Sequence, residues 1–365
     1  MALRPPPPPT IDPANPNIWR WEDMGLTLIH NFITEAEEAA LINGFHAHES
    51  QKPKQPTNFS TKKRISQHFG YNFDYTTFSA SPDRYTPIPD YIASILPRLP
   101  QVLPGEPFRL PDQLTVQYYP PGSGIPPHVD THSAFGEALY SLSYGGAVPM
   151  QFRPAGPNDA RKMRLPKRSL MSTAASPEPS SASSSPRPAS SSPPPGTSSL
   201  PPSSGTSKKE EEEDPPAWDL ILPPRSLLIM TGPSRYGYVH GIRSRKTDVI
   251  PVRMLEHLGQ VGVTGLGLVA EQDNGEQDTV TPTERAEEDG EGEKVVVAPR
   301  RGRYSLTMRT VEFETAGHCE CAYPGVCDAR IRQEQLEEQR KTAQSNGQCA
   351  STPSDASETK TDYTT

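Results

Sequence analysis

A series of short β-type segments, from residue 114 onward, limits most strongly how this chain can fold. Apolar residues alternate or cluster over 114–119, 140–144, 148–152, 222–230, 238–242 and 304–313. Segments of this length, several of them separated by Pro or Gly, are typical of strands. Many short strands connected in this way are found in double-sheet jelly rolls. The sequence therefore predicts a double-stranded β-helix, or jelly roll, as the core of the protein.

The N-terminal region predicts elements that would cover this core. Residues 26–29 have the composition of a strand, and Thr34 and Glu37 form a capping box ahead of an apolar run. Gly44 would end this helix after about ten residues. Apolar spacing over 91–99 predicts a second helix. We therefore expect an α+β fold, with the N-terminal helices packed on one sheet.

Composition indicates long unfolded segments around and within one domain. The chain has 365 residues, but 44 are Pro and only 33% are hydrophobic, which is too few to bury every segment in a core. We expect one domain over 18–328. A disordered Ser/Pro-rich insert at 172–216 and an acidic insert at 271–294 would interrupt it. A disordered Pro-rich arm, 1–17, would precede it, and a polar tail, 329–365, would follow.

Two segments have nearly the same sequence and compete for one strand position. Residues 165–171 read LPKRSLM, and residues 222–230 read LPPRSLLIM. We favour the second segment for the strand, because His240 follows it at short range. The first segment would be a duplicated edge or an error in how the chain was assembled.

The formal charge of −8 comes from one stretch. Residues 271–294 contain ten acidic and two basic residues, so the rest of the chain is balanced. A balanced domain can bind nucleic acid where basic residues gather on one face.

No segment of the sequence predicts export or membrane insertion. The N-terminus is a proline run without an apolar stretch, and no run reaches the roughly 18 apolar residues of a membrane helix. Three of the four cysteines cluster, which favours metal ligation in a reducing compartment over disulfides. We expect a cytoplasmic protein, with the nucleus as the alternative, and no membrane partner.

Five residues have the types and the spacing expected of a site for iron and a dicarboxylate. His128 and Asp130 form a His-x-Asp pair, and His240 follows a later predicted strand. Two His and one carboxylate on one face of iron mark non-haem Fe(II) oxygenases. Arg303 and Arg309 are six residues apart on a predicted strand, so both point to the same side. Because the guanidinium fork binds carboxylates in pairs of hydrogen bonds, these arginines predict a dicarboxylate next to the iron.

Each of these residues also has a simpler interpretation. His128 could be a surface histidine in a Gly/Pro-rich loop, and Asp130 could be a turn former or helix cap. Arg303 and Arg309 could be exposed strand residues. Their joint occurrence in this order favours the metal site.

The order of these motifs and the residues within them resemble those of the AlkB family of Fe(II)/2-oxoglutarate dioxygenases. They are most similar to the AlkB homologue branch that hydroxylates modified wobble uridine in tRNA. The similarity covers about 25–328 outside the two inserts. The matching segments are 25–29 (GLTLI), 68–71 (HFGY), 124–132 (GIPPHVDTH), 225–232 (RSLLIMTG) and 240–242 (HGI).

The resemblance implies a role for each matching residue. His128, Asp130 and His240 would be the catalytic iron ligands. Arg303 would pair with the distal carboxylate of 2-oxoglutarate, and Arg309 would lie near the end that chelates iron. The remaining positions that the resemblance assigns to the cosubstrate are Tyr119, Ser305 and Gln117. Gln117 departs from the family, which usually has Asn there, although Gln offers the same groups on a longer arm.

The implied activity is oxidation with Fe(II), 2-oxoglutarate and O2 as cofactor and cosubstrates. The first hypothesis is hydroxylation of a wobble-uridine side chain in tRNA. The second is oxidative demethylation of alkylated nucleic acid or protein. The third is a non-catalytic scaffold on a zinc-stabilised jelly roll, which the intact iron triad and both arginines disfavour.

A second metal site is predicted after the arginine strand. Cys319, Cys321 and Cys327 form a C-x-C-x5-C run, and three clustered thiols suggest structural zinc with one further ligand. His132 is the best candidate for that ligand, and the wobble-uridine branch has a similar arrangement. His318 is the rival ligand. Three unligated cysteines in a loop are the alternative, and Cys349 is expected to be a free thiol.

Basic and aromatic residues upstream of the iron site predict a substrate surface. Lys62, Lys63 and Arg64 precede His68 and Tyr71, a mixture that suits a phosphate backbone with splayed bases. In the AlkB family the matching region covers the flipped nucleotide. A solvated basic loop above core aromatics is the alternative.

The expected partner is tRNA or another nucleic acid. The sequence contains neither the RNA-recognition module nor the methyltransferase that flank the dioxygenase in animal proteins of the wobble-uridine branch. We therefore expect a separate tRNA methyltransferase as a partner, and a monomer.

Overall fold

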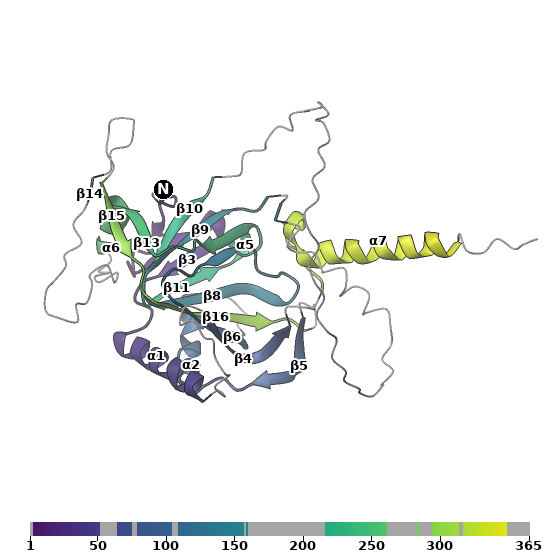
Figure 1. Ribbon diagram of the computed structural model, residues 1–365, viewed down its shortest axis with the longest axis horizontal. Coiled ribbons are helices and arrows are strands. Elements are labelled where there is room, and N and C mark those ends of the chain that lie inside the picture. Colours follow the sequence, from purple (N-terminus) through teal and green to yellow (C-terminus); the bar gives the residue numbers. More distant parts are fainter. Residues whose placement is uncertain are drawn as a thin grey trace, which may run out of the picture. The chain divides into compact units, whose positions relative to one another are not determined.

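Two large β-sheets, a small third sheet and the helices around them build the domain (Figure 1). The computed structural model describes residues 3–51, 64–74, 79–103, 109–156, 158–159, 216–260, 283–284, 294–313 and 317–348. Most of the predicted inserts 172–216 and 271–294 lies outside these ranges, as does the segment 165–171.

The larger sheet has nine strands in the order β1-β2-β3-β11-β8-β16-β6-β4-β5. Its strands are β1 (Thr10–Ile11), β2 (Ile18–Trp21), β3 (Leu26–Ile29), β4 (Ile65–Asp74), β5 (Ser79–Thr86), β6 (Gln113–Tyr119), β8 (Phe135–Gly145), β11 (Ser226–Met230) and β16 (Arg303–Val311).

The second sheet has four strands in the order β10-β9-β12-β7. These are β7 (Ile125–His128), β9 (Val148–Pro154), β10 (Trp218–Leu222) and β12 (Tyr238–Ile242). A three-stranded sheet adds β13 (Thr247–Pro251), β15 (Lys294–Pro299) and β14 (Thr283–Glu284). From β6 to β12 successive strands lie in opposite members of the two larger sheets, except that β9 and β10 share the four-stranded sheet. Strand β16 then returns to the nine-stranded sheet between β8 and β6, so the predicted jelly-roll core is confirmed.

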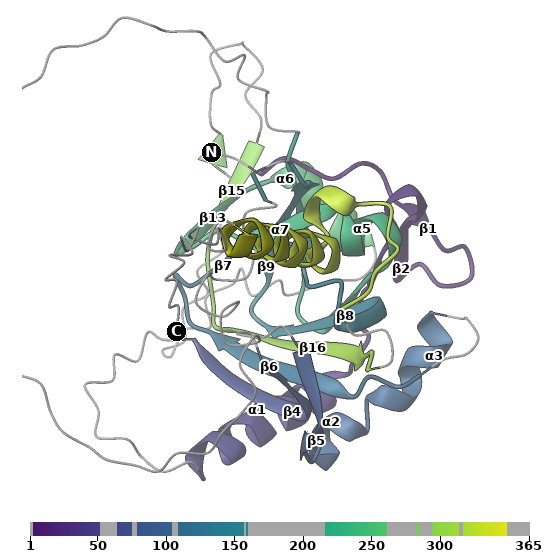
Figure 2. The same ribbon diagram turned by 90° about the vertical axis from the view of Figure 1, so that its right-hand side faces the viewer.

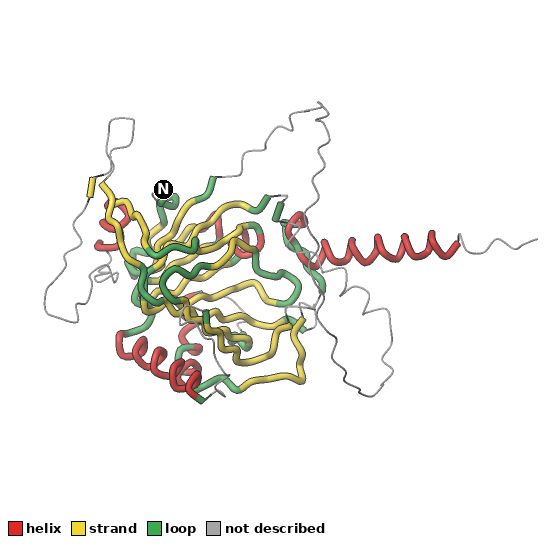
Figure 3. The backbone as a smooth tube through the Cα atoms, in the orientation of Figure 1, coloured by secondary structure: helices red, strands yellow, loops and turns green. Residues whose placement is uncertain are grey.

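Helices are few, as the tube view shows (Figure 3). They are α1 (Glu35–Ser50), α2 (Asp90–Ala93), α3 (Leu99–Val102), α5 (Gly232–Tyr236), α6 (Val252–Gln260) and α7 (Asp328–Gln348), with 3-10 turns η1 (Glu22–Met24), η2 (Leu96–Arg98) and η5 (Pro324–Val326). In the described part of the chain, no helix combines the length and apolar character needed to cross a membrane.

The large sheet is apolar on both faces, which makes the domain three layers deep. Leu227 and Ile229 of β11 belong to the apolar cluster shared with α1 and α2. Their neighbours Leu228 and Met230 belong to the cluster between the two sheets. Successive strand residues point to opposite faces, so one strand contributes to both cores. Helices α1 and α2 therefore cover one sheet, as the sequence predicted (Figure 2).

Helix α1 begins where the sequence predicted and ends later. Thr34 Oγ1 accepts from Glu37 N, and Glu37 Oε2 accepts from Thr34 N, which completes the capping box. Gly44 does not end the helix, so that prediction was wrong. A Cβ at Gly44 would lie 2.7 Å from the Tyr91 ring. The glycine instead lets α2 approach α1 closely.

The second predicted helix, 91–99, was also wrong in extent. The chain there forms the short α2, a 3-10 turn at η2 and the short α3. Pro97 and Pro100 lack the N–H that a continuous helix needs, so the segment is broken into turns.

The predicted strand 222–230 is two strands, which lie in different sheets. Pro223 and Pro224 interrupt it, and Arg225 adopts a left-handed φ of 63°. β11 then pairs with β3 and β8, so the second of the two similar segments fills the strand position.

The N-terminal arm is packed, in contrast to the disordered arm that composition predicted. Leu3 is buried, and Leu3 N donates to Val249 O. The backbone N–H of Arg4 donates to Asp219 Oδ2, and the backbone N–H of Asp219 donates to the Arg4 carbonyl. Trp21 Nε1 donates to Pro7 O at 2.7 Å. Prolines lose little conformational entropy on packing, so these few contacts are enough to order the proline run.

The first half of the predicted polar tail, 329–365, lies in helix α7. Helix α7 projects from the body of the domain at its far end (Figure 1). Its first turn is buried, with Asp328 fully enclosed and Ile331 in an apolar cluster with Val129 and Val239. This first turn therefore belongs to the folded domain.

Candidate functional site

A cavity of about 420 Å³ is lined by strands of both sheets. The polar residues at its wall include most of the predicted site. These are Arg64, Thr115, Gln117, Tyr119, His128, Asp130, Thr131, Ser141, Asp159, His240, Arg303, Ser305, Thr307 and Arg309. Arg303, Ser305, Thr307 and Arg309 alternate along β16, so the strand period of two brings all four to the cavity.

His128, Asp130 and His240 converge in this cavity. His128 on β7 pairs in register with His240 on β12, and their ring centroids are 4.5 Å apart. Asp130 follows β7 by two residues, and its Oδ2 lies 3.3 Å from His240 Nε2. One ligand atom from each residue lies within 4.8 Å of the others, which is the spacing of a metal centre.

The charge states suit metal binding. Burial, and then the neighbouring His240, lower the pKa of His128 to about 4, so its imidazole is neutral. His128 Nδ1 lies 2.9 Å from the Pro126 carbonyl oxygen. Because a carbonyl can only accept, Nδ1 carries the proton and Nε2 remains for a metal. Burial raises the pKa of Asp130, but Arg309 and the two imidazoles outweigh it and hold this pKa well below its usual range.

Arg309 orients the carboxylate of Asp130. Arg309 Nη2 donates to Asp130 Oδ1 at 3.0 Å, and Nη1 donates to Gln113 Oε1 at 3.2 Å. The guanidinium also lies 5.2 Å from the centre of the Phe135 ring. With Oδ1 held by Arg309, Oδ2 faces His240.

Arg303 is a buried cation with one donor left over. It is only 3% exposed, and its Nε and Nη2 donate to Ser143 Oγ at 3.2 and 2.7 Å. Nη1 is buried and finds no hydrogen-bond partner among the described residues. The guanidinium lies 5.6 Å from the centre of the Tyr119 ring. A buried unpaired donor on a charged group is costly, so this atom marks a place for an anion.

Tyr119 and Gln117 form a short chain of polar contacts beside Arg303. The Tyr119 hydroxyl donates to Gln117 Oε1, and Gln117 Nε2 donates to Ser66 Oγ at 3.2 Å. Burial raises the pKa of Tyr119, so its hydroxyl stays protonated and able to donate. Ser305 Oγ lies 3.4 Å from Ser141 Oγ on the neighbouring strand.

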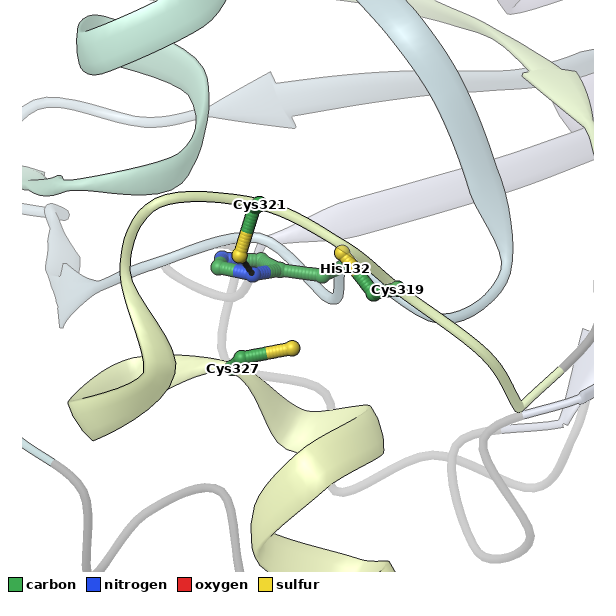
Figure 4. Close-up of side chains that lie close together, drawn as sticks. All are labelled: His132, Cys319, Cys321 and Cys327. Carbon is green, nitrogen blue, oxygen red and sulfur yellow. Dashed lines mark hydrogen bonds between the residues drawn. The ribbon is translucent and has the colours of Figure 1, made fainter.

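A second cluster joins His132 to three cysteines. Figure 4 shows the imidazole among the sulfur atoms of Cys319 and Cys321, which lie on one loop, and of Cys327, just before α7. Cys321 Sγ lies 3.3 Å from His132 Nδ1, and all four ligand atoms lie within 4.8 Å of one another. His318 is outside this cluster and instead contacts Glu320 at 3.3 Å on the surface.

Without a metal, Cys321, Cys327 and His132 are all uncharged. Burial raises the pKa of Cys327 and of Cys321, so both thiols are protonated. Burial, then Arg235, lower the pKa of His132 to about 4, so its imidazole is neutral. A thiolate-binding metal would have to displace protons from the cysteines.

The predicted substrate residues are not gathered in one place. Arg64 lines the cavity and lies 6.0 Å from the Tyr119 ring centre. His68 is exposed on β4, with Nδ1 3.2 Å from Thr115 Oγ1. Tyr71 does not line the cavity and packs edge-on against Tyr85 and Phe313. Lys62 and Lys63 lie outside the described residues.

Several cavity residues were not singled out from the sequence, among them Phe73, Phe135 and Asp159. Phe73 and Phe135 lie 4.9 Å apart between ring centres and form an apolar wall. Phe73 belongs to the aromatic stretch after Arg64, which is the signal that could have identified it. Asp159 is held by Arg153 at 2.8 and 2.9 Å. It lies just past the end of a strand, where nothing in the sequence distinguishes it from a turn residue.

The family profile described as "2OG-Fe(II) oxygenase superfamily" matches residues 25–309. The chain is 28% identical over 313 residues to tRNA (carboxymethyluridine(34)-5-O)-methyltransferase alkbh8 of Xenopus tropicalis, which covers 85% of this chain and 35% of that protein. It is 30% identical over 235 residues to the alkylated DNA repair protein ALKBH8 homolog of Arabidopsis thaliana, covering 63% of this chain and 54% of that protein.

A relative of lower sequence identity is a different AlkB homologue. The chain is 25% identical over 229 residues to alpha-ketoglutarate-dependent dioxygenase alkB homolog 4 of Mus musculus, covering 62% of this chain and 65% of that protein. The chain spans about a third of the length of the frog relative. The profile match covers most of the chain and includes His128, Asp130, His240 and both arginines. The chain therefore belongs to the 2OG-Fe(II) oxygenase superfamily, as an AlkB-family dioxygenase.

Proposed function

We propose that this dioxygenase hydroxylates the side chain of a modified uridine at the wobble position of tRNA. One observation carries the oxidation chemistry. A single cavity contains two imidazoles, a carboxylate and the unpaired Nη1 of Arg303. The tRNA substrate is supported by the relatives, one of which is named as a carboxymethyluridine(34) methyltransferase.

His128, Asp130 and His240 fit Fe(II). Their donor set, two imidazoles and one carboxylate, is the one that non-haem Fe(II) oxygenases use. His128 Nε2 is left for a metal because Pro126 holds Nδ1, and Asp130 Oδ2 points to His240 Nε2 because Arg309 holds Oδ1. Bound Fe(II), with 2-oxoglutarate and O2, supplies the oxidising power that hydroxylates an unactivated C–H bond.

Arg303 fits the distal carboxylate of 2-oxoglutarate. Nη1 has no partner among the described residues, while Ser143 occupies the other edge of the same guanidinium. A carboxylate in this position would satisfy the buried cation. The Tyr119 hydroxyl and Ser305, on the neighbouring wall, are proposed to orient the same molecule.

His132, Cys319, Cys321 and Cys327 fit structural zinc. Three sulfurs and one nitrogen in a closed group of four are the ligands that Zn²⁺ prefers in structural sites. Zinc there would tie the loop after β7 to the start of α7.

The cavity suits a nucleobase that has left its stack. Phe73 and Phe135 offer an apolar wall, and Arg64 adds a positive charge at the cavity. Extrusion costs least from a single-stranded loop, which fits the anticodon. We propose that Arg64, with Lys62, Lys63, His68 and Tyr71, contacts the RNA.

The decisive experiment incubates the purified, iron-loaded full chain with 2-oxoglutarate and tRNA from cells that lack the protein. We expect succinate to form and a wobble uridine to gain one oxygen atom, as seen by mass spectrometry of nucleosides. The variant Asp130→Ala is the control and should do neither. Succinate without any change in tRNA would support a dioxygenase but reject this substrate.

Oxidative demethylation is the second candidate function. It is favoured by the Arabidopsis relative, which is named as an alkylated DNA repair protein. Hydroxylation of a methyl group on nitrogen would release formaldehyde, whereas a hydroxylated carbon side chain keeps its oxygen. If methylated RNA or DNA yields formaldehyde in proportion to the succinate formed, the protein has this second function.

Two further proposals concern the cellular setting. We propose that the protein works in the cytoplasm. We also propose that a separate tRNA methyltransferase works with it, since the frog relative is named as such an enzyme. Recovery of a tRNA methyltransferase with the tagged protein from a cytoplasmic fraction would test both.

A further inference from the structure

One short segment carries a ligand of each metal centre. Asp130 belongs to the proposed iron site and His132 to the proposed zinc site. Residues 129–134, between β7 and β8, form neither helix nor strand. Asp130, His132 and Ser133 are nevertheless all 9% exposed or less. Their backbone groups therefore need partners other than a strand ladder.

Asp328 holds this segment from one side. Its Oδ1 accepts from the backbone N–H of His132 at 2.6 Å and of Ser133 at 3.2 Å. Its Oδ2 accepts from the hydroxyl of Ser133 at 2.5 Å and from that of Thr131. The carboxylate is completely buried, and Arg332 balances its charge at 2.9 Å.

Arg235 holds the same segment from the other side. Its Nη1 donates to the Asp130 carbonyl at 3.3 Å and its Nη2 to the Thr131 carbonyl at 2.7 Å. Arg235 is 1% exposed, and its guanidinium lies 4.9 Å from the Tyr236 ring centre. The Tyr236 ring packs edge-on against His132, with centroids 4.9 Å apart.

We propose that Asp328 and Arg235 are positioning residues for the iron centre. Asp328 accepts from the N–H groups of His132 and Ser133, and Arg235 donates to the carbonyls of Asp130 and Thr131. The backbone is therefore held on two sides from Asp130 to Ser133. The Asp130 carboxylate is then directed at the metal by its own backbone as well as by Arg309. This inference rests on the iron assignment made above.

A positioning role differs from a role in stability alone. Groups that orient metal ligands typically change metal affinity about 10- to 100-fold when they are removed. A buried ion pair elsewhere in the domain should change stability without changing metal affinity. The pair of Asp248 and Arg300 is such a control, with both residues at most 8% exposed and bonds of 2.6 and 2.8 Å. Neither residue lines the iron cavity.

The test uses the zinc-loaded full chain and Mn(II), which accepts the same nitrogen and oxygen ligands as Fe(II) and does not react with O2 in the assay. Free Mn(II) is counted by electron paramagnetic resonance for wild type, Asp328→Asn, Arg235→Met, Asp248→Asn and His128→Ala. Zinc content and thermal unfolding are measured on the same samples.

We expect Asp328→Asn and Arg235→Met each to weaken Mn(II) binding by about 10- to 100-fold while zinc stays bound. Asp248→Asn should lower the unfolding temperature and leave Mn(II) affinity unchanged. Wild-type affinity in both Asp328→Asn and Arg235→Met overturns the proposal, as does an equal loss in Asp248→Asn. If wild type shows no Mn(II) site that His128→Ala removes, the iron assignment itself fails, and this inference fails with it.

Discussion

His128 and His240 face each other across paired strands, β7 and β12, with ring centroids 4.5 Å apart. The two residues are far apart in the sequence, and the register of the four-stranded sheet alone brings them together. A slip of that register by one residue would turn one ring to the opposite face. The proposed metal centre therefore depends on the pairing of β7 with β12 as much as on its ligand residues.

Arg303→Ala should weaken 2-oxoglutarate binding strongly. A hydrogen bond to a charged group contributes about 1.5–3 kcal/mol, which corresponds to roughly a 10- to 100-fold loss of affinity. Calorimetric titration of the Mn(II)-loaded protein with 2-oxoglutarate measures it. Ser143→Ala is the matched variant, because Ser143 only orients Arg303, and it should cause a smaller loss. A normal titration curve for Arg303→Ala would remove Arg303 from this role.

Cys321→Ala should lower both zinc content and thermal stability. Cys321 is one of four ligands in a closed group, and a structural zinc contributes directly to folding. Elemental analysis and thermal unfolding measure the two effects. Cys349 lies outside the described residues, and Cys349→Ala is the control that should change neither. Unchanged zinc in Cys321→Ala would reject the cluster as a zinc site.

His30 should make the protein less stable in acid. Burial lowers its pKa to about 4 from 6.5, and neither ring nitrogen has a partner among the described residues. Below pH 6.5 the unfolded chain gains a proton that the folded chain does not. The contribution of neutral His30 to the free energy of unfolding is therefore fully present above pH 6.5 and is lost as the pH falls toward 4. The loss between pH 7.5 and pH 5 should be about 2 kcal/mol.

The variant His30→Leu isolates this effect, because Leu cannot titrate and the site packs against the Trp19 ring. Urea unfolding at both pH values gives the free energies. The difference between the two pH values should be about 2 kcal/mol smaller in the variant than in wild type. An identical pH dependence in the two proteins would show that His30 is not buried as a neutral ring.

Gly44→Ala should destabilise the fold, although Ala favours helices more than Gly does. The added Cβ would meet the Tyr91 ring at 2.7 Å, and overpacking of this kind costs about 1–3 kcal/mol. Urea unfolding measures the change. Combining it with Tyr91→Ala removes the ring, so the Ala substitution should become neutral or stabilising in that background. A stabilising Gly44→Ala in the wild-type background would contradict the close approach of α1 and α2.

The structural features that follow from the sequence, and the motifs that suggested the proposed sites, depend on residues near one another in sequence. Thr34 and Glu37 form their capping box within one helical turn, so the start of α1 follows from local pattern. The strand period of two was enough to align Arg303 and Arg309 toward one cavity. The His-x-Asp pair and the run of cysteines are likewise short patterns, whose chemistry is recognisable before any fold is known.

The features that were missed or wrong depend on a partner far along the chain. Gly44 is a contact point for Tyr91 and not a helix stop, and the prolines of the arm are ordered by Trp21 and Asp219.

The sequence by itself determined which residues have side chains suited to the iron, dicarboxylate and zinc sites proposed here, and that a β-rich domain would carry them. Only the tertiary structure decided that His128 lies opposite His240, that His132 lies among the cysteines, and that Asp328 and Arg235 hold the segment between the two centres. The physical reason is that ligand type and period are local properties, whereas strand register and the burial of a charge depend on how distant segments pack.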